Sequence, residues 1–235
     1  MTASYAVYCV IDLDREVPES SAGLQAGTVC CLPYRGIGVA VSLLAQPIRD
    51  IVAGAVEHET VVEHLMQAHT VLPMRFPTIF PSREAVLAMM SQHYDSFRES
   101  LHRLRNQVEF GIRVIRSVTR SPSAEEEPPL RASVPQESSG QLYMRERYRR
   151  YRHSQALQQQ AAAVQRRLDA ALREFVTAKR LRTPATDSFA FDGVYLVDKD
   201  RGADFRRAFV TARGSESGFR YLFSGPWPPY SFVTI

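Results

Sequence analysis

The stretch NQVEFGIRVIRS, Asn106–Ser117, decides which fold the sequence predicts. Its apolar residues alternate with polar ones, which is the pattern of a strand with one buried face. The chain after it offers a long helical stretch, then a strand, a short helix and another strand, the last three over 189–197, 203–212 and 219–224. We assign Asn106–Ser117 to this later group, because the sheet of that group would otherwise lack a partner strand. The order of elements is then a strand, a long helix, a strand, a short helix and a strand.

This succession is similar to a ferredoxin-like α+β unit with its first crossover enlarged. We therefore predict an α+β protein of two domains, an N-terminal α+β domain over 1–105 and a modified ferredoxin-like domain over 106–235. Residues Tyr230–Ile235 are expected to add a last strand. Residues 119–139 are rich in Pro, Ser and Glu and have little to bury, which predicts a flexible insertion.

The predicted long helix, residues 141–182, holds most of the positive charge. It carries ten arginines and one lysine against three acidic residues, whereas the whole chain has a net charge of +4. The remainder is therefore net acidic. A heptad-like row of apolar residues runs along this helix and could dock on the chain's own sheet or on a partner helix. The row consists of Leu157, Ala161, Val164, Leu168, Ala171, Phe175 and Ala178.

The start of this helix supports an alternative function. MRERYRRYRH, Met144–His153, interleaves Arg with Tyr, which suits phosphate contact and base stacking. A nucleic-acid-binding module using residues 144–153 is thus one interpretation. Because the rest of the chain is net acidic and shows no known nucleic-acid module, a solvated face or a face for an acidic protein partner is the preferred one.

The first 105 residues predict strands and helices around a short proline-rich segment. The expected strands are Ser4–Leu13, Gly27–Leu32 and Ile37–Leu44, the last two forming a hairpin. Helices are expected over 48–67 and 83–105. The first of them should bury Val52, Val56, Val62, Leu65 and Met66. Between the helices, His69–Ser82 contains three prolines, which predict an ordered crossing loop.

The sequence offers no constellation that would support catalysis, a metal or a cofactor. His58 and His64 flank two glutamates, but they lie about 240° apart on a helix and Val62 stands where a zinc helix needs its second histidine. Glu59 and Glu63 are expected to form a solvated acidic face. The three cysteines are expected to be small core residues. We therefore predict a protein that is not an enzyme, with no catalytic, cofactor-binding or metal-binding residue.

Composition and length fit a globular protein of one large or two ordinary domains. Hydrophobic residues make up 45% and charged residues 23% of the 235 residues. No stretch approaches the ~20 apolar residues of a membrane span, and the N-terminus lacks a basic region typical of a secretory signal. These features predict a cytoplasmic protein without membrane contact.

The last eleven residues, GPWPPYSFVTI, are stiff and apolar. Three prolines fix backbone angles, and each of the three aromatic side chains would contribute roughly 1.5–3 kcal/mol if buried. We expect this tail to be clamped across the cleft between the two domains, and a partner-binding surface remains the alternative. The same two interpretations apply to Leu72–Phe76 (LPMRF), in which Arg75 is expected to pair with a buried carboxylate or with carbonyls near the tail.

Three stretches together resemble the gas vesicle protein F/L family. They are HETVVEHLMQAHTVLPMRFPTIF at His58–Phe80, VYLVDKDRGADFRRAF at Val194–Phe209, and GPWPPYSFV at Gly225–Val233. Weaker similarities lie in the opening strand, in Glu109–Val114 and at Gly140–Arg147. Pro77 stands where the family usually has Gly, which makes this loop stiffer.

The resemblance implies a minor, non-enzymatic component of gas vesicles, the gas-filled protein shells that give cells buoyancy. It implies a role in vesicle nucleation and assembly, contact with the hydrophobic shell protein and with other accessory proteins, location at the vesicle within the cytoplasm, and a two-domain α+β architecture. Nucleic acid, membrane and cofactor are not expected partners. The candidate structural or partner-contact residues are Leu72, Pro73, Met74, Arg75, Phe76, Gly225, Pro226, Trp227, Pro228, Pro229, Tyr230 and Phe232.

Overall fold

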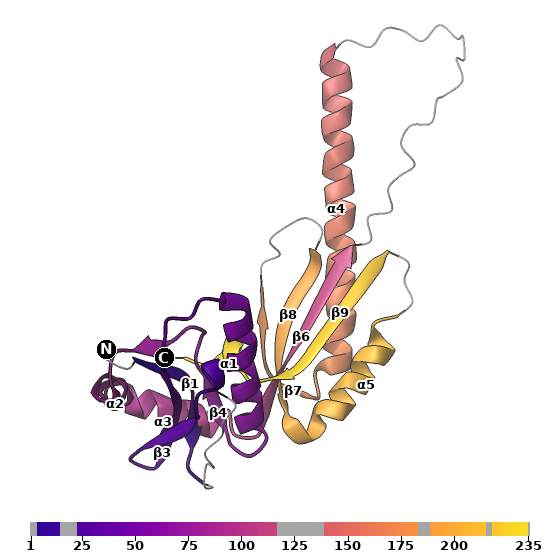
Figure 1. Ribbon diagram of the computed structural model, residues 1–235. Coiled ribbons are helices and arrows are strands. Elements are labelled where there is room, and N and C mark those ends of the chain that lie inside the picture. The colour runs from indigo at the N-terminus through magenta and orange to yellow at the C-terminus, as the bar shows by residue number, and fades with distance from the viewer. Residues whose placement is uncertain (1–3, 15–22, 117–138, 183–188, 215–217, 235) are drawn as a thin grey trace, which may run out of the picture.

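The computed structural model describes residues 4–14, 23–116, 139–182, 189–214 and 218–234. These residues form a mixed α/β structure with two antiparallel sheets, each accompanied by its own helices (Figure 1). The sheets follow one another along the chain: residues 4–80 supply the strands of the first and residues 107–227 those of the second. Residues 119–138 of the predicted insertion lie outside the described residues. Its last residue, Ser139, is the first residue of a helix.

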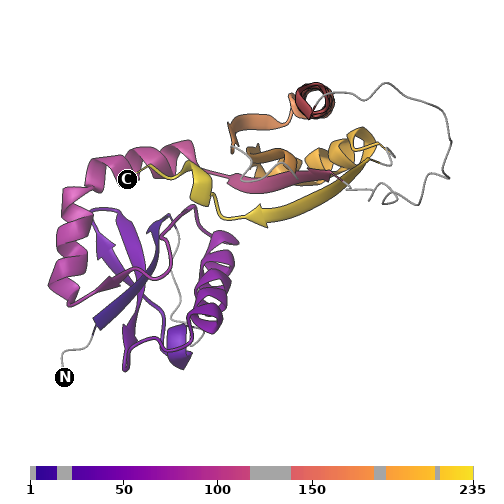
Figure 2. The same cartoon turned by 90° about the horizontal axis from the view of Figure 1, so that it is seen from above.

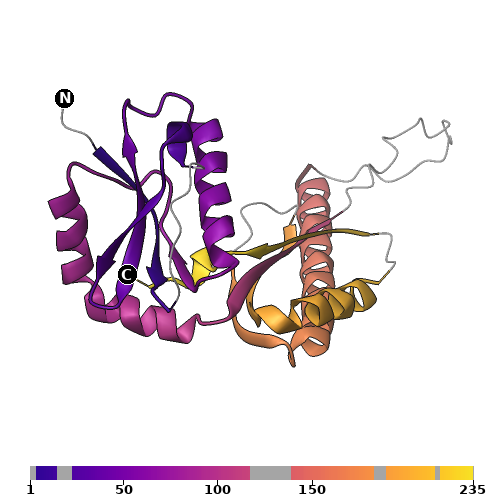
Figure 3. The same ribbon diagram turned by 60° about the horizontal axis from the view of Figure 1, so that its bottom comes forward.

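The first sheet has the order β2-β3-β1-β4, and β5 also pairs with β1. Its strands are β1 (Ser4–Asp12), β2 (Cys30–Tyr34), β3 (Ile37–Leu44), β4 (Val71–Pro73) and β5 (Ile79–Phe80). Helices α1 (Ile51–Met66), α2 (Arg83–Gln92) and α3 (Tyr94–Arg103) flank it. Figure 3 shows α1 on one face of this sheet and α2 and α3 on the other. Because successive side chains of a strand point to opposite faces, β1 supplies both: Val10 packs on the α2 and α3 side and Ile11 on the α1 side.

Three details of this half differ from the sequence-based expectation. The hairpin is confirmed, but its first strand begins at Cys30 rather than Gly27. The crossing loop contains the short strands β4 and β5, which pair with β1 because the three prolines lie at or beyond the ends of these strands. The helix expected over 83–105 is two helices, since His93 leaves helical geometry between α2 and α3.

The buried face of α1 was predicted correctly at Val62 and Leu65 and incorrectly at Val52 and Val56, which are 76% and 63% exposed. The side of α1 that packs on the sheet also carries Gly54, His58 and Val61. Gly54 is required there, because a Cβ would lie 2.9 Å from the ring of Phe76. A stripe that includes a glycine and a histidine escapes a pattern search based on hydrophobicity.

The second sheet has the order β7-β8-β6-β9, with the Asn106–Ser117 strand in its interior. Its elements are β6 (Gln107–Arg116), α4 (Ser139–Leu172), β7 (Val176–Leu181), β8 (Phe189–Asp198), α5 (Gly202–Ala212) and β9 (Phe219–Trp227). Both helices lie on one face of the sheet (Figure 2). The expected inward residues of β6 are confirmed, because Val108, Phe110, Ile112 and Val114 are all buried with α4 and α5 residues.

Two boundaries in this half correct the prediction. The long helix ends at Leu172 and not at residue 182, because Val176–Leu181 pairs with β8 as an edge strand. No proline or glycine marks this end in the sequence, so only tertiary pairing reveals it. The expected last strand is also wrong: β9 already includes Trp227, and Tyr230–Phe232 form a 3-10 turn. Among the described residues, no helix is long and apolar enough to span a bilayer.

Candidate functional site at the junction of the two sheets

The tail leaves the second sheet and ends against the first half of the molecule (Figure 3). Its anchor is Phe232, which is only 2% exposed. The ring belongs to a cluster that joins Leu101 of α3 with Val194 and Leu196 of β8. Arg180 of β7 lies over the same ring, with its guanidinium carbon 5.6 Å from the centroid. One side chain of the tail therefore contacts elements of both halves.

Hydrogen bonds fix the tail backbone around this anchor. The backbone N–H and the hydroxyl of Ser231 both donate to the carboxylate of Glu109, at 2.8 Å each. Arg103 of α3 donates to the carbonyl of Phe232 at 2.8 Å, and Arg182 donates to the Ser231 hydroxyl at 3.0 Å. Glu109 itself is 7% exposed, so these donors supply the hydrogen bonds that its buried carboxyl group needs.

A further hydrogen bond connects the tail to α1. The Tyr230 hydroxyl donates to the Glu59 carboxylate at 2.6 Å. Burial raises the pKa of Glu59, although the hydrogen bond from Tyr230 opposes the shift. Burial, with the nearby Glu59 carboxylate, also raises the pKa of the Tyr230 phenol. Glu59 was expected on a solvated face, but it is part-buried and accepts a hydrogen bond from Tyr230. Because Tyr230 is 171 residues away, no local pattern reveals this contact.

The remaining tail residues divide into buried and accessible ones. Pro228 and Pro229 are buried, whereas Pro226 is exposed and Trp227 is 38% exposed. Gly225 has φ +108, and a Cβ there would lie 2.6 Å from the Glu109 carbonyl oxygen. Glycine is thus the residue that allows β9 to pass so close to β6 at the register shift just before the tail.

The LPMRF segment lies beneath the same junction. Leu72 and Met74 are buried in the cluster that contains Phe232, and Pro73 is buried beside them. The carbonyl of Met74 lies 3.0 Å from Nε2 of His58, whose pKa is lowered by burial. His58 is in turn 5.6 Å from Phe76, ring centroid to ring centroid. Sequence reasoning selected two distant segments, and the structure brings Leu72 and Met74 of one together with Phe232 of the other.

Arg75 differs from its neighbours. Its side chain is exposed, and within the described ranges no carboxylate lies at ion-pair distance from it. The expected buried carboxylate partner is therefore not found among those residues.

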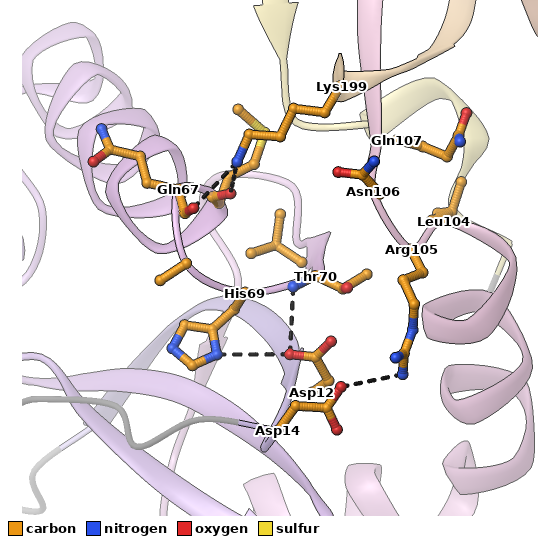
Figure 4. Close-up of a pocket in the computed structure, with 13 residues that line it drawn as sticks. Asp12, Asp14, Gln67, His69, Thr70, Leu104, Arg105, Asn106, Gln107 and Lys199 are labelled. Atoms are coloured by element: carbon orange, nitrogen blue, oxygen red, sulfur yellow. Dashed lines mark hydrogen bonds and ion pairs between the residues drawn. The ribbon is translucent and has the colours of Figure 1, made fainter. Parts of the chain in front are cut away.

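A polar pocket of about 310 Å³ lies at the same junction (Figure 4). Asp12 faces His69 with 3.6 Å between Oδ1 and Nδ1, and Arg105 is 3.2 Å from Asp14. Lys199 donates to the carbonyls of Met66 and Gln67 at the end of α1, at 3.2 and 3.1 Å. Of these contacts, the two hydrogen bonds from Lys199 join the β8–α5 connection to the end of α1 and so link the two halves.

Asn106, which also lines this pocket, is hydrogen-bonded to two acidic side chains. Asn106, with φ +57, donates to Asp198 and to Asp200 at 3.0 Å each. Sequence reasoning did not select these residues, although Lys199 and Asp200 lie within the VYLVDKDRGADF stretch. In the parts of the chain that are described, no three His, Cys, Asp or Glu side chains gather as they would around a metal ion.

The Arg/Tyr-rich segment at 144–153 lies on the part of α4 that extends beyond the sheet (Figure 1). Met144, Tyr148 and Tyr151 are 62%, 61% and 59% exposed. The segment is therefore accessible to a partner, and it is remote from both the tail and the polar pocket.

Comparison with known proteins identifies the family. A family model described as gas vesicle synthesis protein GvpL/GvpF matches residues 4–234. Gas vesicle protein L of Streptomyces sp. (strain CB03234) is 31% identical over 185 residues, covering 76% of this chain and 68% of that protein. Gas vesicle protein F of the same strain is 28% identical over 190 residues, covering 79% and 77%.

Solved structures share the fold over the full length. The crystal structure of GvpF from Anabaena sp. PCC7120 superposes with a TM-score of 0.79 at 15% identity, covering 99% of both chains. That of GvpF from Microcystis aeruginosa gives 0.73 at 16% identity, covering 100% of both chains. On the match of its sequence from residue 4 to residue 234, the chain belongs to the GvpL/GvpF family of gas vesicle synthesis proteins.

Proposed function

We propose that this protein is a non-catalytic accessory protein that acts in the nucleation and assembly of gas vesicles by binding the hydrophobic shell protein. The observation that carries the proposal is the family match over residues 4–234. Other vesicle accessory proteins are its further proposed partners, and the vesicle within the cytoplasm is its proposed location. The role requires an accessible apolar surface and no reactive centre.

The proposal includes a two-domain arrangement, with domains at 1–105 and 106–235. The second would be a ferredoxin-like domain whose first crossover is the enlarged α4. Its support is the succession β6-α4-β7-β8-α5-β9 and the antiparallel order β7-β8-β6-β9. On this arrangement, Phe232 and Leu72–Phe76 act as a structural lock between the domains, and Trp227 is the tail aromatic left accessible for a partner.

The shell protein would bind in a groove on the helix-free face of the second sheet. The groove encloses about 340 Å³, and Trp227, Leu222, Gly111 and Val194 contribute to its lining. Trp227 and Leu222 are 38% and 41% exposed, so both offer apolar surface to a partner. A Cβ at Gly111 would lie 2.7 Å from the Ser224 hydroxyl oxygen, so this glycine lets Ser224 of β9 lie close against β6. Glu109, Arg113, Arg182 and Asp192 also line the groove, so the apolar contact with a very apolar shell subunit would be made by Trp227 and Leu222.

The test is co-purification of the tagged full-length protein with the shell protein. Wild-type protein should retain the shell protein, and the double variant Trp227→Ala with Leu222→Ser should retain little of it. Val210→Ser is the matched control, because Val210 is 50% exposed on α5, on the opposite face of the sheet. Failure of the wild-type protein to retain any shell protein, while other accessory proteins are retained, would contradict the proposal.

A further inference from the structure

About half of α4 extends beyond the sheet that supports its other half. Val164, Leu168 and Leu172 anchor its C-terminal part in the core. Between residues 140 and 160, every described side chain is exposed except that of Glu146, which is half-buried. Figure 1 shows this part of α4 standing away from both sheets. A helix in this setting lacks the tertiary packing that stabilises most helices.

This free part of α4 carries an apolar stripe between positive charges. Met144, Tyr148 and Tyr151 follow steps of four and three, so they share one face of the helix. Arg147 and Arg152 flank that face, and the Arg152 guanidinium carbon lies 5.9 Å from the centre of the Tyr148 ring. We call these five residues the basic stripe. Exposed aromatic side chains in a row are typical of an interaction surface.

The outer face of α1 has the complementary character. Val52 and Val56, one turn apart, are 76% and 63% exposed. Glu63 lies on the same face of α1 about two turns after Val56, Glu57 lies at the edge of that face, and residues 49–67 contain four acidic side chains against one arginine. We call Val52, Val56, Glu57 and Glu63 the acidic stripe. In Figures 1 and 2 α1 lies well away from the free part of α4, so one chain does not bring its own two stripes together.

We propose that the acidic stripe of one copy of this chain docks on the basic stripe of a second copy. The apolar side chains of both stripes would cover one another, and the glutamates would face the arginines. Pairing of two α4 helices is disfavoured, because residues 140–160 carry five arginines against one glutamate and would repel a copy of themselves. Each chain offers one stripe of each kind, so the contact is head-to-tail and propagates along a row of copies.

The experiment is sedimentation velocity of the full-length protein across a concentration series, at about 20 mM and about 500 mM NaCl. The wild-type protein should form larger species as concentration rises at low salt, and these should dissociate at high salt. Arg147→Glu with Arg152→Glu should raise the dissociation constant about tenfold or more, and so should Glu57→Arg with Glu63→Arg. Mixing the two double variants should restore association, because unlike charges then face each other at every contact between the two variants.

A second pair of substitutions guards against misfolding, since Glu57 also accepts a hydrogen bond from the backbone of Gln25. Val52→Ser with Val56→Ser changes only exposed side chains, so it should weaken association while leaving the melting temperature unchanged.

A wild-type protein that stays monomeric at low salt overturns the inference, as does association that survives Glu57→Arg with Glu63→Arg. Binding of a labelled single-stranded DNA by a monomeric wild type, lost in Arg147→Glu with Arg152→Glu, would instead assign the basic stripe to nucleic acid. None of these substitutions changes the groove at Trp227. Capture of the shell protein can therefore fail or succeed independently of the association between copies of this chain.

Discussion

The tail and the free part of α4 are both rich in aromatic residues, yet they have opposite environments. In the tail, Phe232 is buried and Tyr230 and Ser231 each donate a hydrogen bond to a carboxylate. On α4, Tyr148 and Tyr151 are about three-fifths exposed and lie on a helix surrounded by solvent. The difference lies in what the rest of the chain offers: the tail meets Glu59, Arg103 and Glu109, whereas no described element covers the α4 stripe. Aromatic content alone therefore predicts neither burial nor a partner.

Removal of the tail anchor should give the largest effect on stability. Phe232→Ala is expected to lower the free energy of unfolding by about 3–5 kcal/mol, because it empties a site shared by both halves of the core. Urea unfolding followed by fluorescence and by circular dichroism measures this. A loss below about 1 kcal/mol would show that the tail is not a structural lock.

Loss of the tail's buried acceptor should have an intermediate effect. Glu109→Leu leaves the Ser231 N–H and hydroxyl without their acceptor, and we expect a cost of about 1–3 kcal/mol. The matched control is Asp192→Leu, which removes a carboxylate on the same sheet that pairs with a part-exposed Arg113 and should cost less than about 1 kcal/mol. Urea midpoints of the two variants, compared at equal m-value, decide between them.

How far the sequence predicts these regions depends on whether the interactions are local. Alternation in Asn106–Ser117 and the three-and-four spacing in α5 depend on neighbours along the chain, and both elements were predicted correctly. The end of α4 at Leu172 and the burial of Glu59 depend on pairing with distant segments, and both were missed. The same holds for the polar pocket, whose Asp12, His69 and Lys199 come from three separate parts of the chain.

The contact between the tail and α1 should also make stability depend on pH. Burial raises the pKa of Glu59 in the folded protein, so the folded state holds this proton more tightly than the unfolded state does. The contribution of Glu59 to stability is therefore fully present below its ordinary pKa of about 4.3, falls as pH rises through the raised folded value, and is constant above it. Urea unfolding of wild type and Glu59→Gln across this range measures the effect.

The difference between the two proteins isolates Glu59, because other titrating groups are common to both. Wild type should lose stability relative to Glu59→Gln as pH rises, and the two curves should run parallel above the folded pKa. Tyr230→Phe removes the hydrogen bond that opposes the shift, so the fall should extend to higher pH in that variant. A wild-type curve that gains stability with rising pH relative to Glu59→Gln would contradict this account.

The smallest effect on stability is expected on the free part of α4. Tyr148→Ala and Tyr151→Ala remove side chains that are mostly exposed, and alanine is the best helix former, so the free energy of unfolding should change by no more than about 0.5 kcal/mol. Far-ultraviolet circular dichroism and urea unfolding at low protein concentration provide the measurement. At high concentration and low salt the same variants should lower the proportion of larger species, because the stripe then has a second copy to contact. A loss of stability comparable to that of Phe232→Ala at low concentration would mean that this part of α4 packs within its own chain, and the contrast with the tail would disappear.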